Sequence, residues 1–399
     1  MKDNFSLFQY RCWTFIFIFL SHTLGAQKWD TLAPIPEDLT FPVVVAVDGK
    51  IHIMGGGGSG GATDHHYAYD PATENWETKA PVPYKAQQPA GAAANGKIHF
   101  FGGGFPNSGT PLNDHYIYDP VADAWAPGAD LTSARAIHYG VSLNDVVYTL
   151  AGQGKSNVCQ AYDAANDAWI TKNALPDNFF WYGAHVAAEG HIYRFCGGGY
   201  TAPNAFAHRY DPGNDMWVSL PPFPHATHAI KGAAIDKKIY LVGGYYDFLE
   251  RTEVWIYDTE AGTYTPGTPL PLGRNYHNVV AIGECIYVLG GNNAIDESVG
   301  VQLLRFCPEA TSAVRPNVSS MPVQVSYTAE HLTLSAPKEL QGQAGISVLN
   351  MAGAIVFSRE TYMDGGNQQQ IWVGPLVPGL YVVQLQNKDS LFVGRISAF

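Results

Sequence analysis

The chain has 399 residues, of which only 15% are charged, and its net charge is −12. This charge and the lack of any Lys/Arg run exclude a nucleic-acid-binding surface, which needs clustered positive charge. The 42 glycines and 26 prolines predict many turns, and therefore many short strands.

Residues 1–26 are typical of a secretory signal peptide. Lys2 and Arg11 precede the apolar run Cys12–Leu20, which is too short to span a bilayer, and Gly25-Ala26 suits a cleavage site. An uncleaved N-terminal anchor is the alternative. No later stretch is long and apolar enough to span a membrane. We therefore expect a protein without a membrane span after leader removal, secreted or held at the cell surface.

A Tyr-Asp pair recurs along residues 27–308, each time with an aromatic residue seven positions after the tyrosine. The tyrosines of these pairs are Tyr69, Tyr118, Tyr162, Tyr210 and Tyr257. Pairs of small residues begin at Gly55, Gly102, Ala151, Gly197, Gly243 and Gly290, in steps of 47, 49, 46, 46 and 47 residues. A fixed period near 50, filled with short β-branched and aromatic runs, predicts repeated four-stranded antiparallel sheets.

The two ends of the repeat array complement each other. The sixth repeat has Phe306 and Cys307 in place of the Tyr-Asp pair, and no aromatic residue follows at the expected distance. Near the start of the mature chain, Trp29 precedes Trp76 by 47 residues, which is one period. We therefore expect the N-terminal strand to complete the sixth sheet, which closes a ring and removes open sheet edges.

The glycine pair, the Tyr-Asp pair and the spaced tryptophan resemble the motif of Kelch-repeat β-propellers, over roughly residues 27–308. The departures are Ala151 for the first glycine, Tyr264 for the tryptophan and the degenerate sixth repeat. The resemblance implies an all-β, six-bladed Kelch β-propeller. Sialic-acid mutarotases, galactose-oxidase-like enzymes and pure binding proteins share this architecture, so the fold leaves the function open.

The period stops after residue 308. Residues 309–320 are expected to form a linker, and residues 321–399 a small β-sandwich. The motifs Val348–Gly353 and Leu376–Val383, with the closing apolar strand, resemble the C-terminal sorting domain of type IX secretion cargo. That resemblance implies export and a secretion machinery as partner, although Arg395 stands alone where the family shows a lysine pair. A purely structural sandwich is the alternative.

In a propeller, the loops before the innermost strands and those after the glycine pairs lie on one face, around the channel. Arg-x-x-His occurs twice in register there, as Arg135/His138 and Arg274/His277. These arginines are candidates for holding a carboxylate through two hydrogen bonds, and bonding to neighbouring loop carbonyls is the alternative. Aromatic rings and a histidine on the same loops are candidates for stacking on sugars or for packing between sheets: Trp181, Tyr182, Tyr200, His228, Tyr245 and Tyr246.

We therefore expect an exported protein that binds a glycan or an extracellular protein through the channel face, without a metal or cofactor. His66 and His115 occupy equivalent places in adjacent repeats, which indicates inheritance rather than a metal site. The alternatives are a cofactor-free carbohydrate enzyme resembling the sialic-acid mutarotases, in which the Arg-x-x-His residues would act, and a structural surface protein.

Cysteine positions give one further expectation. Cys285 begins the second strand of the sixth repeat and Cys307 ends the third. Because these strands are antiparallel neighbours, we expect a disulfide between the two residues. Cys159 and Cys196 map to the channel-side ends of adjacent sheets, and their pairing is left open.

Overall fold

The computed structural model describes residues 28–398 except for several short stretches, which are 59–60, 105–109, 154–156, 177–180, 200, 309–316, 319–323, 329–330, 336–341, 351–354, 364–367, 378 and 387–389. The expected signal peptide and most of the expected linker lie outside the described residues. The chain divides into two compact units, residues 1–308 and residues 309–399. Among the described elements, none is a helix with the length and apolarity needed to cross a bilayer.

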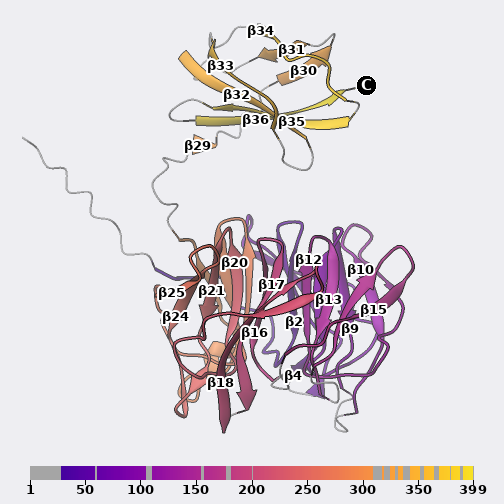
Figure 1. Cartoon of the computed structure of the whole chain (residues 1–399), viewed down its shortest axis with the longest axis vertical. Helices are drawn as coiled ribbons and strands as arrows, with labels where there is room; N and C mark the ends of the chain where they lie inside the picture. The colour runs from indigo at the N-terminus through magenta and orange to yellow at the C-terminus, as the bar shows by residue number, and fades with distance from the viewer. Residues whose placement is uncertain are drawn as a thin grey trace, which may run out of the picture. The chain divides into compact units, whose positions relative to one another are not determined.

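The described part of the first unit contains six four-stranded antiparallel sheets (Figure 1). From the innermost strand outward, and in chain order, they are β2 (Val43–Val47), β3 (Lys50–Met54), β6 (His66–Asp70) and β7 (Asn75–Thr78); β8 (Ala90–Ala94), β9 (Lys97–Phe101), β10 (His115–Asp119) and β11 (Ala124–Pro127); β12 (Tyr139–Leu143), β13 (Val146–Leu150), β14 (Cys159–Asp163) and β15 (Ala168–Lys172); β16 (Ala184–Ala188), β17 (His191–Gly199), β18 (Ala202–Asp211) and β19 (Met216–Ser219); β20 (Lys231–Ile235), β21 (Lys238–Val242), β24 (Val254–Asp258) and β25 (Thr263–Pro266); β26 (Asn278–Ile282), β27 (Cys285–Leu289), β28 (Leu303–Phe306) and β1 (Asp30–Thr31).

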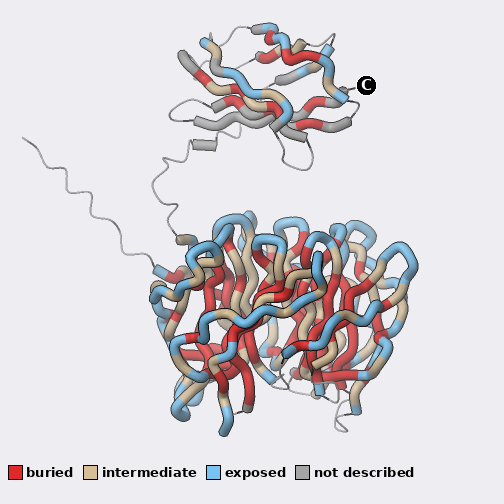
Figure 2. Tube along the Cα trace, in the orientation of Figure 1, coloured by how far each residue is buried: buried red, intermediate tan, exposed pale blue. Residues whose placement is uncertain are grey.

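The innermost strands close a ring. β2, β8, β12, β16, β20 and β26 each contact the next in this order, and β26 contacts β2. Two short hairpins, β4 (Gly57–Gly58) with β5 (Gly61–Ala62) and β22 (Tyr245–Tyr246) with β23 (Leu249–Glu250), and the 3₁₀ helix η1 (Glu297–Val301) lie outside the six sheets. Buried residues follow the strands, while the connecting loops are largely exposed (Figure 2). The all-β propeller expected from the repeats is confirmed.

The repeat aromatic residues tie each sheet to the sheet before it. Trp125 donates its indole N–H to the carbonyl of Ala80 at 3.0 Å. Tyr264, which replaces tryptophan in the fifth repeat, donates its hydroxyl to the carbonyl of Pro221 at 3.0 Å. This departure from the motif therefore keeps the link between neighbouring sheets.

The first position of each small-residue pair has a positive φ, and the structure corrects one pair. In the fourth repeat, Cys196 has φ +56° and Gly197 follows with +121°, so the equivalent pair is Cys196-Gly197 and not Gly197-Gly198. The register of β17 and β18 shifts at this point. Close approach explains the glycines, because a Cβ added to Gly102 would lie 2.5 Å from Nε2 of His138 in the next sheet.

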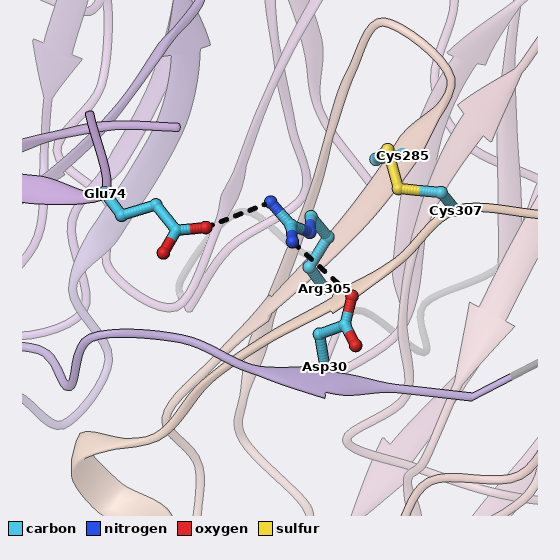
Figure 3. Close-up of a disulfide and its surroundings, with 5 residues drawn as sticks. All are labelled: Asp30, Glu74, Cys285, Arg305 and Cys307. Atoms are coloured by element: carbon cyan, nitrogen blue, oxygen red, sulfur yellow. Dashed lines mark hydrogen bonds and ion pairs between the residues drawn. A yellow bond between two sulfur atoms is a disulfide. The ribbon is translucent and has the colours of Figure 1, made fainter. Parts of the chain in front are cut away.

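The N-terminal strand completes the last sheet. β1 pairs antiparallel with β28, with Asp30 opposite Arg305. Arg305 also contacts Asp30 and Glu74 of the first sheet, at 3.4 Å each (Figure 3). The ring of Trp29 lies 5.0 Å from that of Phe306. The first and last repeats are therefore joined through a strand from the opposite end of the unit.

A disulfide links Cys285 and Cys307 across β27 and the end of β28, with their Cα atoms 4.1 Å apart (Figure 3). Cys159 and Cys196 are free and buried. Burial raises the pKa of the Cys159 thiol to about 12 and raises that of Cys196 as well, so neither forms a thiolate at neutral pH.

Two buried histidine pairs occupy equivalent places in the first two sheets. Nδ1 of His52 lies 2.9 Å from Nε2 of His66, whose Nδ1 lies 3.1 Å from the Ala80 carbonyl. Nδ1–H of His66 must donate to that carbonyl, so its Nε2 accepts a hydrogen bond from the Nδ1–H of His52 and both rings are neutral. His99 and His115 repeat the arrangement at 2.9 Å.

These pairs predict a loss of stability on mild acidification. Burial is the main cause that lowers the pKa of His52 to about 3 and of His66 to about 4, against 6.5 in an unfolded chain. Below pH 6.5 these histidines are therefore protonated in the unfolded chain but remain neutral in the folded protein. The free energy of unfolding then falls by up to about 1.4 kcal/mol per pH unit for each histidine. Urea unfolding at pH 7 and pH 5 should show this fall, and His52→Phe with His99→Phe should reduce it. An equal unfolding midpoint at both pH values would contradict the assignment.

The second unit is a two-layered β structure. One sheet contains β29 (Asn317–Val318), β36 (Ser390–Ala398), β35 (Gly379–Gln386), β32 (Gly342–Asn350) and β33 (Ile355–Met363), and the other contains β30 (Gln324–Thr328), β31 (His331–Ser335) and β34 (Gln368–Trp372). Leu334 and Ile371 from the second sheet share one buried cluster with Val348 and Val383 from the first. This shared core makes the unit a small β-sandwich, as the sequence predicts.

Candidate functional site

Six equivalent residues, one before each innermost strand, share an unusual backbone conformation. Their φ angles lie between +53° and +56°, and they are Phe41, Gln88, Ile137, Tyr182, Ala229 and Tyr276. Such a conformation is uncommon for residues other than glycine and costs about 1–3 kcal/mol each. Backbone strain of this kind concentrates at ligand-binding sites, where it fixes the direction of side chains.

All of these residues except Ala229 line a recess of about 440 Å³ at one end of the channel, which we call the mouth recess. The remaining lining residues are Pro42, Pro89, His138, Tyr139, Lys231 and Asn278. The first, second, third and sixth sheets each contribute two or three lining residues, while the fourth and fifth contribute one each, Tyr182 and Lys231. The recess has the mixed apolar and polar lining that is typical of a small-molecule site.

Three aromatic rings form one wall of the mouth recess. The centroid of Tyr276 lies 5.0 Å from Phe41 and 4.9 Å from Tyr182, both with T-shaped geometry. Phe41 and Tyr182 stack at 6.0 Å. Gln88 donates its side-chain N–H to the Tyr182 hydroxyl at 3.3 Å. These contacts join rings from three separate sheets and fix their orientation.

Polar side chains gather below this wall. A second space of about 620 Å³ follows the mouth recess into the channel, and Tyr139, His185, Lys231 and Asn278 line it. We call these four residues the channel floor. The His185 and Tyr139 rings stack with centroids 3.8 Å apart, and Nζ of Lys231 lies 5.0 Å from the centroid of the Tyr139 ring. The lysine therefore makes a cation–π contact inside the channel.

The channel floor is positively charged at neutral pH. Desolvation lowers the pKa of Lys231 to about 8, so the amine is still mostly protonated at pH 7. Burial, followed by the charges of Arg194 and Lys231, holds the pKa of His185 well below its usual value, so that ring is neutral. In the described part of the chain, no aspartate or glutamate lines the mouth recess or the channel below it.

The arginines of the two Arg-x-x-His motifs do not face the channel as a carboxylate-binding role would require. The structure buries Arg135 and Arg274 completely. Arg135 donates to Oε1 of Gln160 at 2.7 Å, and Arg274 makes the equivalent bond to Gln302 at 2.8 Å. Both guanidinium groups are thus used inside their own sheets. Arg135 bonds to the buried Gln160 and Arg274 to the partly exposed Gln302, and each also donates to a loop carbonyl.

The histidines of these motifs divide. His138 lines the mouth recess, with its Nδ1 2.9 Å from the Thr149 hydroxyl. His277 is buried and its Nε2 lies 3.0 Å from the Val242 carbonyl, so it joins the fifth and sixth sheets. The structural alternative therefore describes the contacts of both arginines and of His277.

The predicted aromatic residues also divide. Tyr182 lines the mouth recess, and the ring centroid of the half-exposed Trp181 lies 6.3 Å from that of Tyr182. The ring of buried His228 lies 5.2 Å from that of Tyr245 and 6.2 Å from that of Tyr276. Tyr246 faces a different cluster, because it donates its hydroxyl to Glu253 at 2.7 Å. Tyr200 lies outside the described residues.

Sequence reasoning missed the channel floor, although the repeat contains the signal. The equivalent first residues of the innermost strands are Val43, Ala90, Tyr139, Ala184, Lys231 and Asn278. The next position, which faces the channel, is occupied by Val44, Gly91, Gly140, His185, Gly232 and Val279. A lysine aligned with valine and alanine departs from the repeat, and comparing the repeats position by position reveals it.

Comparisons with known proteins support this architecture. Residues 327–397 match the family described as the secretion system C-terminal sorting domain. Kelch-like protein 23 of Homo sapiens is 37% identical over 98 residues, covering 24% of this chain and 18% of that protein. Beta-scruin of Limulus polyphemus is 26% identical over 237 residues, covering 52% of this chain and 26% of that protein. The chain thus spans only a fraction of the length of these curated relatives.

A solved structure of YjhT superimposes with a TM-score of 0.57 at 17% identity, covering 68% of this chain and 95% of that one. At this identity the likeness concerns the fold. The sorting domain indicates secretion to the cell surface or the exterior. The chain is a Kelch-repeat β-propeller followed by a secretion system C-terminal sorting domain.

Proposed function

We propose that this exported propeller binds a carbohydrate through the mouth recess. The observation that supports the proposal is the aromatic wall of Phe41, Tyr182 and Tyr276, whose rings come from three sheets and are held on strained backbone. The C–H faces of a sugar ring are apolar and flat, so they pack well against such rings. Gln88 and the channel floor supply the hydrogen-bonding groups that a sugar also requires.

The recess favours a small ligand over a protein partner. Residues from all six sheets line it, so it is a recess within the ring of strands and not a flat surface of the kind that a folded partner covers. A folded partner would contact the exposed rim loops and would leave the strained inner ring unused. Binding is the activity that we assign to this lining. In the described residues it contains no carboxylate, so an enzymatic function would have to use His138, Tyr139 or Lys231 as acid or base.

Binding to a glycan array, measured for variants that lack the Tyr182 or the Tyr276 ring, tests the proposal. Tyr182→Gly and Tyr276→Gly should each lower binding of the wild-type hits at least tenfold without loss of stability, because glycine tolerates the positive φ at these positions. Ala229→Gly is the matched control, since Ala229 shares the φ angle but does not line the recess. Binding by the wild-type protein that survives both tyrosine changes would contradict the site, and an array without hits would contradict the function.

A follow-up measurement separates binding from catalysis. NMR exchange between the anomers of any hit should proceed at the same rate with and without the protein. Acceleration that disappears in Tyr182→Gly would favour the carbohydrate-enzyme alternative over the binding function.

A further inference from the structure

We propose that the ligand of the mouth recess carries a carboxylate, and that Lys231 on the channel floor binds it. This inference rests on the proposed carbohydrate function and narrows it to acidic sugars of the uronic-acid type. It concerns the charge of the ligand, which the aromatic wall leaves open.

The fold itself does not require a lysine at this position. Lys231 is the first residue of the innermost strand β20. The other five sheets have an uncharged residue at this position, namely Val43, Ala90, Tyr139, Ala184 and Asn278. Two of these residues are buried alanines. A side chain with a long stem and a charge is therefore specific to the fifth sheet, and it points to a role other than packing.

Lys231 lies where a charge is costly without a ligand. Its amine lies 5.0 Å from the centroid of the Tyr139 ring, and among the described residues that line the mouth recess and the channel floor there is no aspartate or glutamate to pair with it. The neutral ring of His185 and the amide of Asn278 share the same floor. A partly desolvated ammonium group next to hydrogen-bonding neutral groups is a site for an anion, since the ligand supplies the missing counter-charge.

Space for the anionic group comes from glycines. Gly91, Gly140 and Gly232 face the channel beside the floor, at positions where the first and last sheets have valine. Gly140 cannot carry a side chain because its Cβ would lie 2.3 Å from the Gly91 carbonyl oxygen, so the close packing of the second and third sheets itself keeps this part of the lining free of side chains. The aromatic wall above and the cleared floor below thus fit a sugar ring with one short charged substituent.

Matched pairs of glycans test the inference. We compare glucuronate with glucose, and galacturonate with galactose, by calorimetry and on the array. The wild-type protein should bind the acidic member of a pair at least tenfold more tightly. Lys231→Met should remove this preference while changing the affinity for the neutral member less than about twofold. Lys97→Met, which removes an exposed lysine paired with Asp119 outside the channel, controls for net charge and should change neither.

The melting temperature provides a second readout. Lys231→Met should raise it, because the change removes a charge that the folded channel desolvates. A lower melting temperature, together with weaker binding of both members, would assign Lys231 a structural role and overturn the inference. Equal binding of acidic and neutral members, or a preference that persists in Lys231→Met, would overturn the inference but leave carbohydrate binding intact. Failure of every glycan to bind would overturn the proposed function and the inference with it.

Discussion

Trp29→Ala is expected to lower the free energy of unfolding by about 3–5 kcal/mol, the range for removing a buried tryptophan. Trp29 is 8% exposed and shares a buried cluster with Val254, Leu270 and Phe306. Its indole donates to the Thr268 carbonyl at 3.2 Å, so the loss includes a link to the fifth sheet. Urea unfolding monitored by circular dichroism measures the change.

The effect should also be local to the closing sheet. Without Trp29, β1 loses its anchor, and the amides of β28 should exchange with deuterium faster than those of β20. Trp217→Ala is the matched control, because Trp217 occupies the equivalent place in a sheet that is continuous in sequence. A loss below about 1 kcal/mol, or an unchanged exchange rate in β28, would show that the N-terminal strand does not secure the ring.

Removing the disulfide with Cys285→Ser and Cys307→Ser is expected to cost about 2–4 kcal/mol. The bond joins residues 22 positions apart in the same sheet that β1 completes, so its loss enlarges the unfolded ensemble by a loop of that size. Chemical denaturation of the double variant, compared with the oxidised wild-type protein, measures this loss.

Reductant serves as the internal control for this prediction. It should destabilise the wild-type protein and leave the double variant unchanged, because Cys159 and Cys196 are buried free thiols. A response of the double variant to reductant would contradict the assignment. When combined with Trp29→Ala, the disulfide variant should cost less than the sum of the two, since both changes release the same sheet.

Most of the fold could be predicted from the repeat itself. The Tyr-Asp pairs and small-residue pairs recur at a nearly fixed period, and a period of that length specifies one sheet per repeat. Trp29 lies one period before Trp76 and belongs to no complete repeat. It predicts the closing strand, because the sixth repeat is the one that has no outer strand of its own. The exception is the fourth repeat, where Cys196 holds the positive φ and hides the true pair from a search for glycines.

The site was less accessible to sequence reasoning. Arg135 and Arg274 have the chemistry of a carboxylate clamp, but their partners Gln160 and Gln302 lie 25 and 28 residues away in the chain. Only the folded sheet brings those groups together, so the sequence does not reveal that both arginines are used internally. Lys231 is the opposite case. The sequence shows that it departs from the repeat pattern, but only the strand register places it on the channel floor.

A crystal structure of the propeller with its tightest array ligand tests the central claim most directly. We expect a sugar ring packed against Tyr182 and Tyr276, with its carboxylate within hydrogen-bonding distance of Nζ of Lys231. Ligand bound on the outer strands or on the opposite face, with the mouth recess holding only solvent, would contradict the account.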